Sequence, residues 1–224
     1  MAEELTPSTI WSQIRDAAGG DRERLNALIA RYRSLVVSFL RRRGCPESDA
    51  EDVAQEVLVR ISREEFLRKA DSERGRFRDL LFTVTRRTLA DHWERENALK
   101  RGGGRDPVPL RPGESAFEGL EPAAPVEQDE FDRLWAQGLL SRALERLRDE
   151  CSARGSSRFD AIRLTQYDGL SYRDAAERLG RKESDVTNDV HLAKTRLKEL
   201  LGDEVRSYCS TEEEWRDEMR AFAR

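Results

Sequence analysis

The side chains best suited to covalent or metal chemistry are sparse in this sequence. Its three cysteines, Cys45, Cys151 and Cys209, are widely separated and form no CxxC pair. Its two histidines, His92 and His191, are also far apart. Zinc sites need such ligands at short, repeated spacings, so we expect reduced structural cysteines and no metal or other cofactor. An enzyme would need a polar constellation around a pocket, and neither histidine has a nearby catalytic partner in sequence, so we expect no enzyme.

The abundant chemistry here is that of charged groups. Charged residues make up 38% of the 224 residues, and the net charge is only -4. Binding to nucleic acid would therefore have to come from local basic patches rather than from a basic chain. No apolar run approaches the roughly 20 residues of a membrane span. The first residues lack a basic start followed by an apolar core, so we expect a cytoplasmic protein with no membrane partner.

The most unusual carboxylates lie on a predicted helix over Asp49 to Ile61. At 100° per residue, Asp49, Asp52 and Glu56 share one face, and Val59 lies among them. A solvated face usually mixes charge signs, whereas this one gathers acids around an apolar residue. The other side of the helix is a complete apolar stripe, which predicts packing into a core. The stripe consists of Ala50, Val53, Ala54, Val57, Leu58 and Ile61.

Arginines gather on a second predicted helix, which runs from Phe77 to about Lys100. Basic residues interleaved with aromatics are typical of surfaces that hold unstacked single-stranded nucleic acid. The alternative is a solvated arginine face over a core aromatic stripe. We favour core burial for Phe82 and Trp93, and nucleic-acid contact for the arginine pair in the middle of the helix. The basic residues are Arg76, Arg78, Arg86, Arg87 and Arg95.

Residues 171–201 carry the spacing of a helix-turn-helix. Ser171 opens a capping box, Ala176 is small where two helices cross, and Gly180 suits a left-handed turn. Val186 would pack the second helix on the first, and that second helix would enter a major groove. An ordinary αα-hairpin is the alternative. The groove-facing candidates are Lys182, Asp185, Thr187, Asn188, His191, Lys194 and Arg196.

Between these motifs, residues 102–128 hold five of the seven prolines and five of the fourteen glycines. Such composition predicts a flexible linker. Both flanks are helix-patterned, so we predict an all-α protein of two small helical domains. A terminal helix follows, and the face that carries Trp215 either caps the second domain or binds a regulator. The predicted divisions are 1–20, an N-terminal helix; 21–101, the first domain; 102–128, the linker; 129–202, the second domain; and 203–224, a C-terminal helical extension.

Taken together, the motifs resemble those of a bacterial RNA polymerase sigma factor of the extracytoplasmic-function (ECF, group four) type of the sigma-70 family. DAEDVAQEVLVRI resembles the polymerase-binding helix of sigma domain two. GRFRDLLFTVTRRTLADHWERE resembles the helix that opens and reads the −10 promoter element. The segment from SYRDAAERLG to HLAKTRLKELL resembles the helix-turn-helix of domain four, which reads the −35 element. The resemblance covers roughly residues 21–201, and the linker takes the place of a missing domain three.

The resemblance implies partners and residue roles. The partners are core RNA polymerase (its β′ coiled coil and β flap), promoter DNA, and an anti-sigma factor or a kinase-linked regulator. The implied polymerase-binding residues are Asp49, Asp52, Gln55, Glu56 and Val59. The implied −10 residues are Ser72, Arg74, Arg76, Arg78, Arg86, Arg87 and Arg95. The implied −35 residues are Ser171, Tyr172, Lys182, Thr187, Asn188, His191, Lys194 and Arg196.

Two positions depart from the family pattern. Thr187-Asn188-Asp189 stands where such proteins have a Lys-Ser-Arg-like run. An aspartate beside phosphates is repulsive, which predicts weak −35 reading or the use of different side chains. Arg86-Arg87 replaces a common Arg-Asn pair, which leaves the −10 preference open. The competing interpretation is a helix-turn-helix regulator that never joins polymerase, which leaves the acidic and the basic-aromatic helices unexplained.

Overall fold

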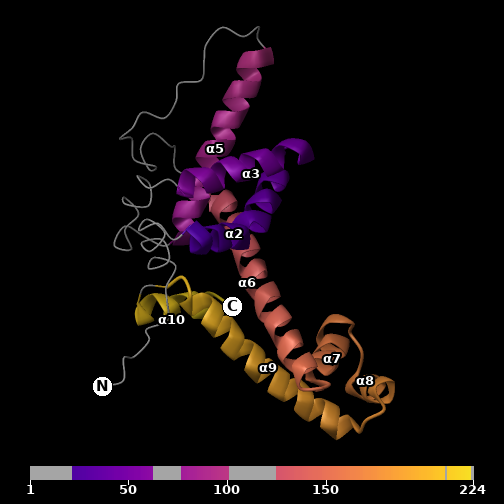
Figure 1. The fold of residues 1–224 in the computed structure, drawn as a ribbon. Coiled ribbons are helices and arrows are strands. Elements are labelled where there is room, and N and C mark those ends of the chain that lie inside the picture. Colours follow the sequence, from indigo (N-terminus) through magenta and orange to yellow (C-terminus); the bar gives the residue numbers. More distant parts are fainter. Residues whose placement is uncertain (1–21, 63–76, 101–124, 210, 223–224) are drawn as a thin grey trace, which may run out of the picture. The chain divides into compact units, whose positions relative to one another are not determined.

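The computed structural model describes residues 22–62, 77–100, 125–209 and 211–222, and each element within them is a helix (Figure 1). The all-α prediction is therefore confirmed for the described part of the chain. The predicted N-terminal helix, residues 1–20, lies outside it, as do residues 71–76, which include three of the implied −10 residues. The elements are α2 (Arg22–Arg42), α3 (Glu47–Ser62), α5 (Phe77–Lys100), α6 (Pro125–Ala153), α7 (Arg158–Ile162), the π-helical turn η2 (Arg163–Tyr167), α8 (Tyr172–Leu179), α9 (Glu183–Arg206) and α10 (Glu212–Ala221).

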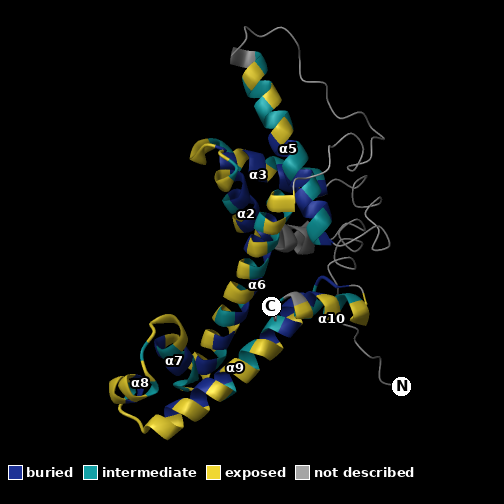
Figure 2. Cartoon of the chain, turned by 180° about the vertical axis from the view of Figure 1, so that it is seen from behind, coloured by how far each residue is buried: buried dark blue, intermediate teal, exposed yellow. Residues whose placement is uncertain are grey.

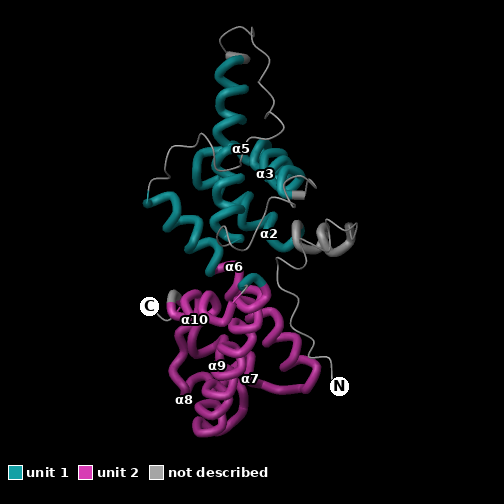
Figure 3. The backbone as a smooth tube through the Cα atoms, turned by 90° about the vertical axis from the view of Figure 1, so that its left-hand side faces the viewer, with its two compact units in different colours: residues 1–136, 208–210 teal, residues 137–207, 211–224 magenta. Residues whose placement is uncertain are grey.

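The chain divides into two compact units (Figure 3). Unit 1 comprises residues 1–136 and 208–210, and unit 2 comprises residues 137–207 and 211–224. The division falls inside α6, whereas the sequence predicted it within residues 102–128. α6 also begins at Pro125, before the predicted linker ends. A proline suits the first position of a helix because the N–H group at that position makes no hydrogen bond within the helix.

Backbone geometry fixes the turn between α2 and α3. Gly44 has φ +85°, and the Cys45 N–H donates to the carbonyl of Leu40 at 3.0 Å. This is the Schellman ending that a glycine after a helix favours. The N–H of Ala50 then donates to the carbonyl of Pro46 at 2.9 Å, and α3 begins at Glu47. The hydroxyl of Ser48 donates to the carboxylate of Asp49 at 2.7 Å.

The apolar stripe predicted for α3 is buried in unit 1, and its six residues are at most 5% exposed (Figure 2). α2 and α5 supply most of the remaining core. The first part of α6 completes it, because Phe131 lies against Phe39 and Phe82 with ring centroids 5.3 and 5.2 Å away. One turn later, Trp135 stacks on Tyr32 at 4.9 Å. Two aromatic residues expected in the second domain therefore belong to the core of unit 1.

Unit 2 contains the predicted helix-turn-helix. The Ser171 hydroxyl accepts from the N–H of Asp174 at 3.1 Å, which caps α8. Gly180 has φ +65° and ends that helix in the left-handed conformation. Ala176 and Val186 are 4% and 0% exposed, so the two helices pack at the predicted positions. α9 begins at Glu183, and no side chain caps its start.

α9 continues through Gly202 to Arg206, past the predicted end of the second domain. α10 then lies against it within unit 2. The indole N–H of Trp215 donates to the carbonyl of Gly202 at 3.0 Å, and the Arg206 guanidinium lies 4.6 Å from the Trp215 ring centroid. Trp215 thus packs within unit 2, in agreement with the first alternative, in which this face caps the second domain. In the described part of the chain, no helix has the length and apolar character needed to cross a membrane.

Candidate protein and nucleic-acid interfaces

The exposed side of α3 is a narrow strip. Ser48, Asp52, Gln55 and Val59 are all exposed, and they recur at the spacing of one helix face. Val59 keeps 46% of its surface exposed, as one of four exposed large apolar residues in the described part of the chain. The structure thus brings together three of the five residues predicted to bind polymerase, with an apolar centre and an acid beside it.

The other two predicted residues of this face have partners within unit 1. Glu56 accepts hydrogen bonds from Arg60 at 2.5 Å and Arg95 at 2.8 Å. Burial raises the pKa of Glu56, but the hydrogen bonds and charges of Arg95 and Arg60 outweigh it and bring the pKa below its ordinary value. Asp49 lies 3.6 Å from Nε2 of His92. The acidic surface is therefore smaller than the sequence indicated.

The arginines predicted to hold the −10 strand are also paired. Arg95 bonds Glu56, as above, so the predicted acidic and basic surfaces meet at that pair. Nε of Arg78 lies 3.1 Å from Asp132, and the Arg78 side chain is only 12% exposed. Nε of Arg86 lies 3.2 Å from Glu127. Both acids come from the first turns of α6, a region the sequence predicted to be linker or second domain.

The remaining −10 candidates divide into two groups. Arg87 is half-buried on α5, one position from Arg86. Ser72, Arg74 and Arg76 lie outside the residues that the structure describes. Of the aromatic residues on α5, Phe82 is 3% exposed, as predicted, whereas Trp93 is only half-buried and lies 5.3 Å from the ring of His92.

On the helix-turn-helix, most predicted −35 residues are exposed on the first turns of α9 or just before it. They present amide, imidazole and ammonium groups, which can hydrogen-bond bases and phosphates. Thr187 is exposed as well, but its side-chain hydroxyl already donates to the backbone carbonyl of Glu183 at 2.9 Å. The exposed residues are Lys182, Thr187, Asn188, His191 and Lys194. Tyr172, in contrast, packs partly buried against the core between α8 and α9, and Ser171 is occupied with capping.

Asp189 does not face outward, contrary to the expectation that it would repel phosphates. It is 8% exposed and accepts a hydrogen bond from the Ser157 hydroxyl at 2.9 Å. Arg181, in the turn before α9, also donates to it, and Nε of Arg158 lies 3.9 Å away. The residue lies next to Val190 on the inner side of α9, and its charge is balanced there by arginines. The expected repulsion therefore has no structural basis.

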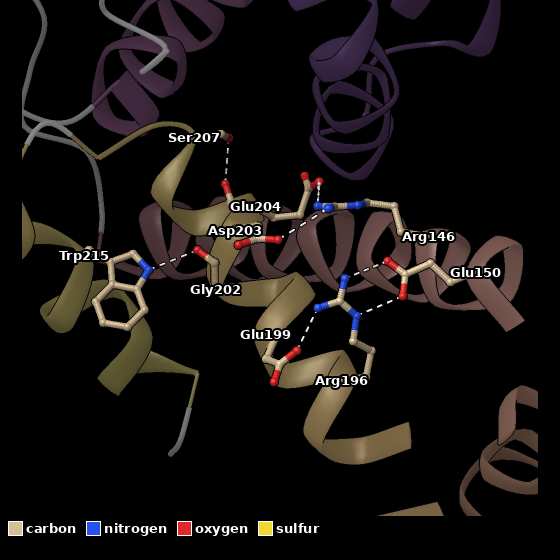
Figure 4. A network of polar contacts seen from close by, with 9 residues as sticks. All are labelled: Arg146, Glu150, Arg196, Glu199, Gly202, Asp203, Glu204, Ser207 and Trp215. Carbon is tan, nitrogen blue, oxygen red and sulfur yellow. Dashed lines mark hydrogen bonds and ion pairs between the residues drawn. The ribbon is translucent and has the colours of Figure 1, made fainter. Parts of the chain in front are cut away.

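Arg196 is likewise turned toward its own unit (Figure 4). It donates to both carboxylate oxygens of Glu150 at 2.8 and 2.7 Å and to Glu199 at 2.7 Å. The hydrogen bond from Arg196 is the main reason that the pKa of Glu150 lies below its ordinary value. A bidentate pair of this kind ties α6 to α9. Of the predicted −35 set, Arg196 is the one residue the structure assigns to an intramolecular ion pair.

Two features of these surfaces were not predicted from the sequence. The acids Glu127, Glu130 and Asp132 of α6 contact arginines of the first domain, whereas the sequence placed Glu127 in the linker and the other two in the second domain. The contact between Arg43 and Glu127 was not predicted either. The available signal was the i, i+4 pair Phe131 and Trp135 beside these acids. In the described residues, no cluster of His, Cys, Asp and Glu could hold a metal ion.

Two helical units, the second with a helix-turn-helix that exposes basic and amide side chains, define a DNA-binding transcription protein. Comparison with known families gives the class more exactly. Residues 28–98 match "Sigma-70 region 2" and residues 157–197 match "Sigma-70, region 4". The two matches together cover half of the chain and follow the family's order. The chain belongs to the sigma-70 family, whose members are non-enzymatic transcription initiation factors that act in promoter recognition.

Among solved structures, the chain is similar to CnrH in its complex with the cytosolic domain of CnrY. The identity is 22% and the TM-score is 0.32. The match covers 85% of this chain and 96% of the other. No curated protein matches the sequence.

Proposed function

We propose that this chain is a sigma factor of the ECF type that binds core RNA polymerase and directs initiation at specific promoters. It recognises and melts promoter DNA in the cytoplasm, while nucleotide addition remains with the polymerase. The observation that carries the proposal is the co-occurrence of sigma-70 regions 2 and 4 with the exposed strip on α3. The ECF type is supported by what separates the two regions, which is residues 99–156, filled largely by α6 and the predicted linker.

The strip Ser48, Asp52, Gln55 and Val59 is the proposed polymerase contact. Protein interfaces combine an apolar centre with a polar rim. Val59 offers the apolar centre, and Asp52, about two turns earlier on the same face of α3, offers a polar group of the rim. A positively charged partner such as the β′ coiled coil fits the acid. Glu56 is not part of this contact in the proposal, because its carboxylate is bonded to Arg60 and Arg95.

A pull-down with core RNA polymerase tests this contact. Asp52→Lys with Val59→Asp should reduce polymerase binding by at least tenfold, since both the apolar centre and the charge complementarity are removed. Glu47→Lys is the matched control, because Glu47 lies on α3 toward Arg41 and its side chain is 82% exposed. Unchanged polymerase binding by the double variant would contradict the proposal.

For promoter DNA, we propose that α9 reads the −35 element through Asn188 and His191, with Lys182 and Lys194 on phosphates. α5 and the residues before it handle the −10 element. Extruding a base costs a few kcal/mol, and stacking of about 1–3 kcal/mol per base offsets that cost. Because Thr187 and Arg196 have intramolecular partners, their share in DNA binding should be small.

Run-off transcription with core polymerase on a pool of promoter fragments tests the activity. Transcripts that depend on the added chain, and that are lost with Asn188→Ala and Lys194→Ala together, support the proposal. Lys198→Ala is the control, since Lys198 is exposed further along α9. DNA binding without any polymerase-dependent transcript would favour a helix-turn-helix regulator that acts alone. Copurification would show whether an anti-sigma factor or a kinase-linked regulator binds the chain.

A further inference from the structure

Three arginines of unit 1 converge on the start of α6. Arg42 ends α2, Arg43 directly follows it, and Arg86 lies in the middle of α5. Arg43 and Arg86 both contact the carboxylate of Glu127, Arg86 at 3.2 Å. Arg42 and Arg43 also lie 3.7 and 3.9 Å from the carboxylate of Glu130. Two acids from one turn of a helix thus occupy a site lined by three guanidinium groups.

The geometry of this site suits an anion with several oxygens. A carboxylate that receives two guanidinium groups from different helices occupies the position in which a phosphodiester oxygen would be bound, because arginine recognises both groups by the same planar geometry. Without Glu127 and Glu130, the three arginines would keep their positive charges and lose these two carboxylate partners. A site of that charge would attract nucleic acid strongly.

The contacts along α6 differ in how firmly they are held. Asp132 pairs with Arg78 beside Phe131, which is 0% exposed, so that part of the helix is fixed by the aromatic core. Glu127 lies one turn nearer the start of α6, at the third residue of the helix, where no aromatic side chain of α6 precedes it. Helix ends open at a small cost in free energy. The first turn can therefore leave the arginines while Phe131 stays in place.

We propose that Arg42, Arg43 and Arg86 form a phosphate-binding site for promoter DNA and that Glu127 and Glu130 occupy it in the free protein. The first turn of α6 is then an internal competitor of DNA, which keeps the unbound chain from binding nucleic acid indiscriminately. The inference rests on the proposed sigma function for the identity of the DNA. Whether the carboxylates of Glu127 and Glu130 compete with phosphate for this site can be tested without polymerase.

The test is binding of a short fluorescein-labelled single-stranded oligonucleotide to the full chain, followed by anisotropy across a salt series. Glu127→Gln with Glu130→Gln should bind about tenfold more tightly at low salt, and the slope of log K against log salt should steepen by up to about 2, since each phosphate contact contributes roughly 0.7. Adding Arg43→Gln and Arg86→Gln to this variant should abolish the gain. If the double variant does not fold, Glu127→Gln alone should give a smaller gain in the same direction.

The matched control is Asp129→Asn with Glu145→Gln. It removes the same charge from exposed positions of the same helix that lie outside this cluster. Equal affinity and slope in the test and control variants would overturn the inference, as would a gain that survives the loss of Arg43 and Arg86. Polymerase pull-down on the same variants keeps the two proposals apart. A chain that shows the DNA gain yet never binds polymerase would refute the sigma function alone.

Discussion

Replacing Asp189 by alanine tests whether this residue organises unit 2 or opposes DNA. The carboxylate accepts from Ser157 at 2.9 Å and from Arg181, with Nε of Arg158 at 3.9 Å. These groups come from the start of α7, the turn of the helix-turn-helix and α9. Removal of Asp189 therefore leaves an unmatched arginine in the turn and a hydroxyl without its acceptor.

The expected loss can be worked from these contacts. A hydrogen bond to a charged group contributes about 1.5–3 kcal/mol. The Arg181 side chain is 36% exposed, so water recovers part of its interaction and the ion pair must be discounted. We expect Asp189→Ala to lower the free energy of unfolding by about 2 kcal/mol. For a domain of this size, that corresponds to a fall in melting temperature of roughly 10 °C. Asp189→Asn keeps an acceptor and should lose about half as much.

Thermal and urea unfolding followed by far-ultraviolet circular dichroism measure the change, and hydrogen exchange locates it. Amides of the helix-turn-helix, including those around Val186, should exchange faster in the variant. Asp185→Ala is the control, because Asp185 is exposed near the start of the same helix. Unchanged stability together with tighter DNA binding would refute this account and restore the view of Asp189 as a repulsive surface charge.

Three further predictions concern other residues of the two units. Phe131→Ala should destabilise unit 1 by about 3–5 kcal/mol in urea unfolding, because its ring is fully buried against Phe39 and Phe82; a loss confined to unit 2 would contradict the assignment. Gly180→Ala should cost about 1 kcal/mol from its positive φ alone, since no atom lies within 4 Å of the new Cβ. The pKa of Glu56 is lowered in the fold, so its contribution is present above the unfolded pKa and lost as pH falls through the folded pKa. Glu56→Gln should flatten the acid limb of a stability–pH curve.

Helical periodicity and turn chemistry were sufficient to predict most elements. The apolar stripe of α3, the limits of α5 and the left-handed glycine between α8 and α9 all follow from rules that act within one or two turns of chain. The first residues of α6 were assigned to the linker because residues 102–128 are rich in proline and glycine, a composition that indicates a flexible segment. Pro125 at the first helical position and the Phe131–Trp135 pair one turn apart were the local signals against that interpretation.

The surfaces were harder to predict, because the sequence gives each charge but not its partner. Arg78, Arg86 and Arg196 were expected to meet phosphates, and each meets a carboxylate from α6 instead. Asp189 was expected beside phosphates because it stands where related proteins have a basic run, yet it lies beside the buried Val190 and is matched by Arg181. Such pairings join positions far apart in sequence, and no periodic pattern records them.

The composition of the unit 1 core bears on how chimeric proteins of this kind should be assembled. Tyr208, which follows α9, is fully buried and lies edge-on to Trp135 at 5.2 Å between ring centroids. Unit 1 is therefore built from two separate stretches of chain, residues 1–136 and 208–210, and the second of them follows the whole DNA-reading module. Exchanging that module between homologues at the proline-rich segment would remove the rings of Phe131, Trp135 and Tyr208 from the recipient. A graft with junctions after Ala136 and before Tyr208 would leave the recipient core whole.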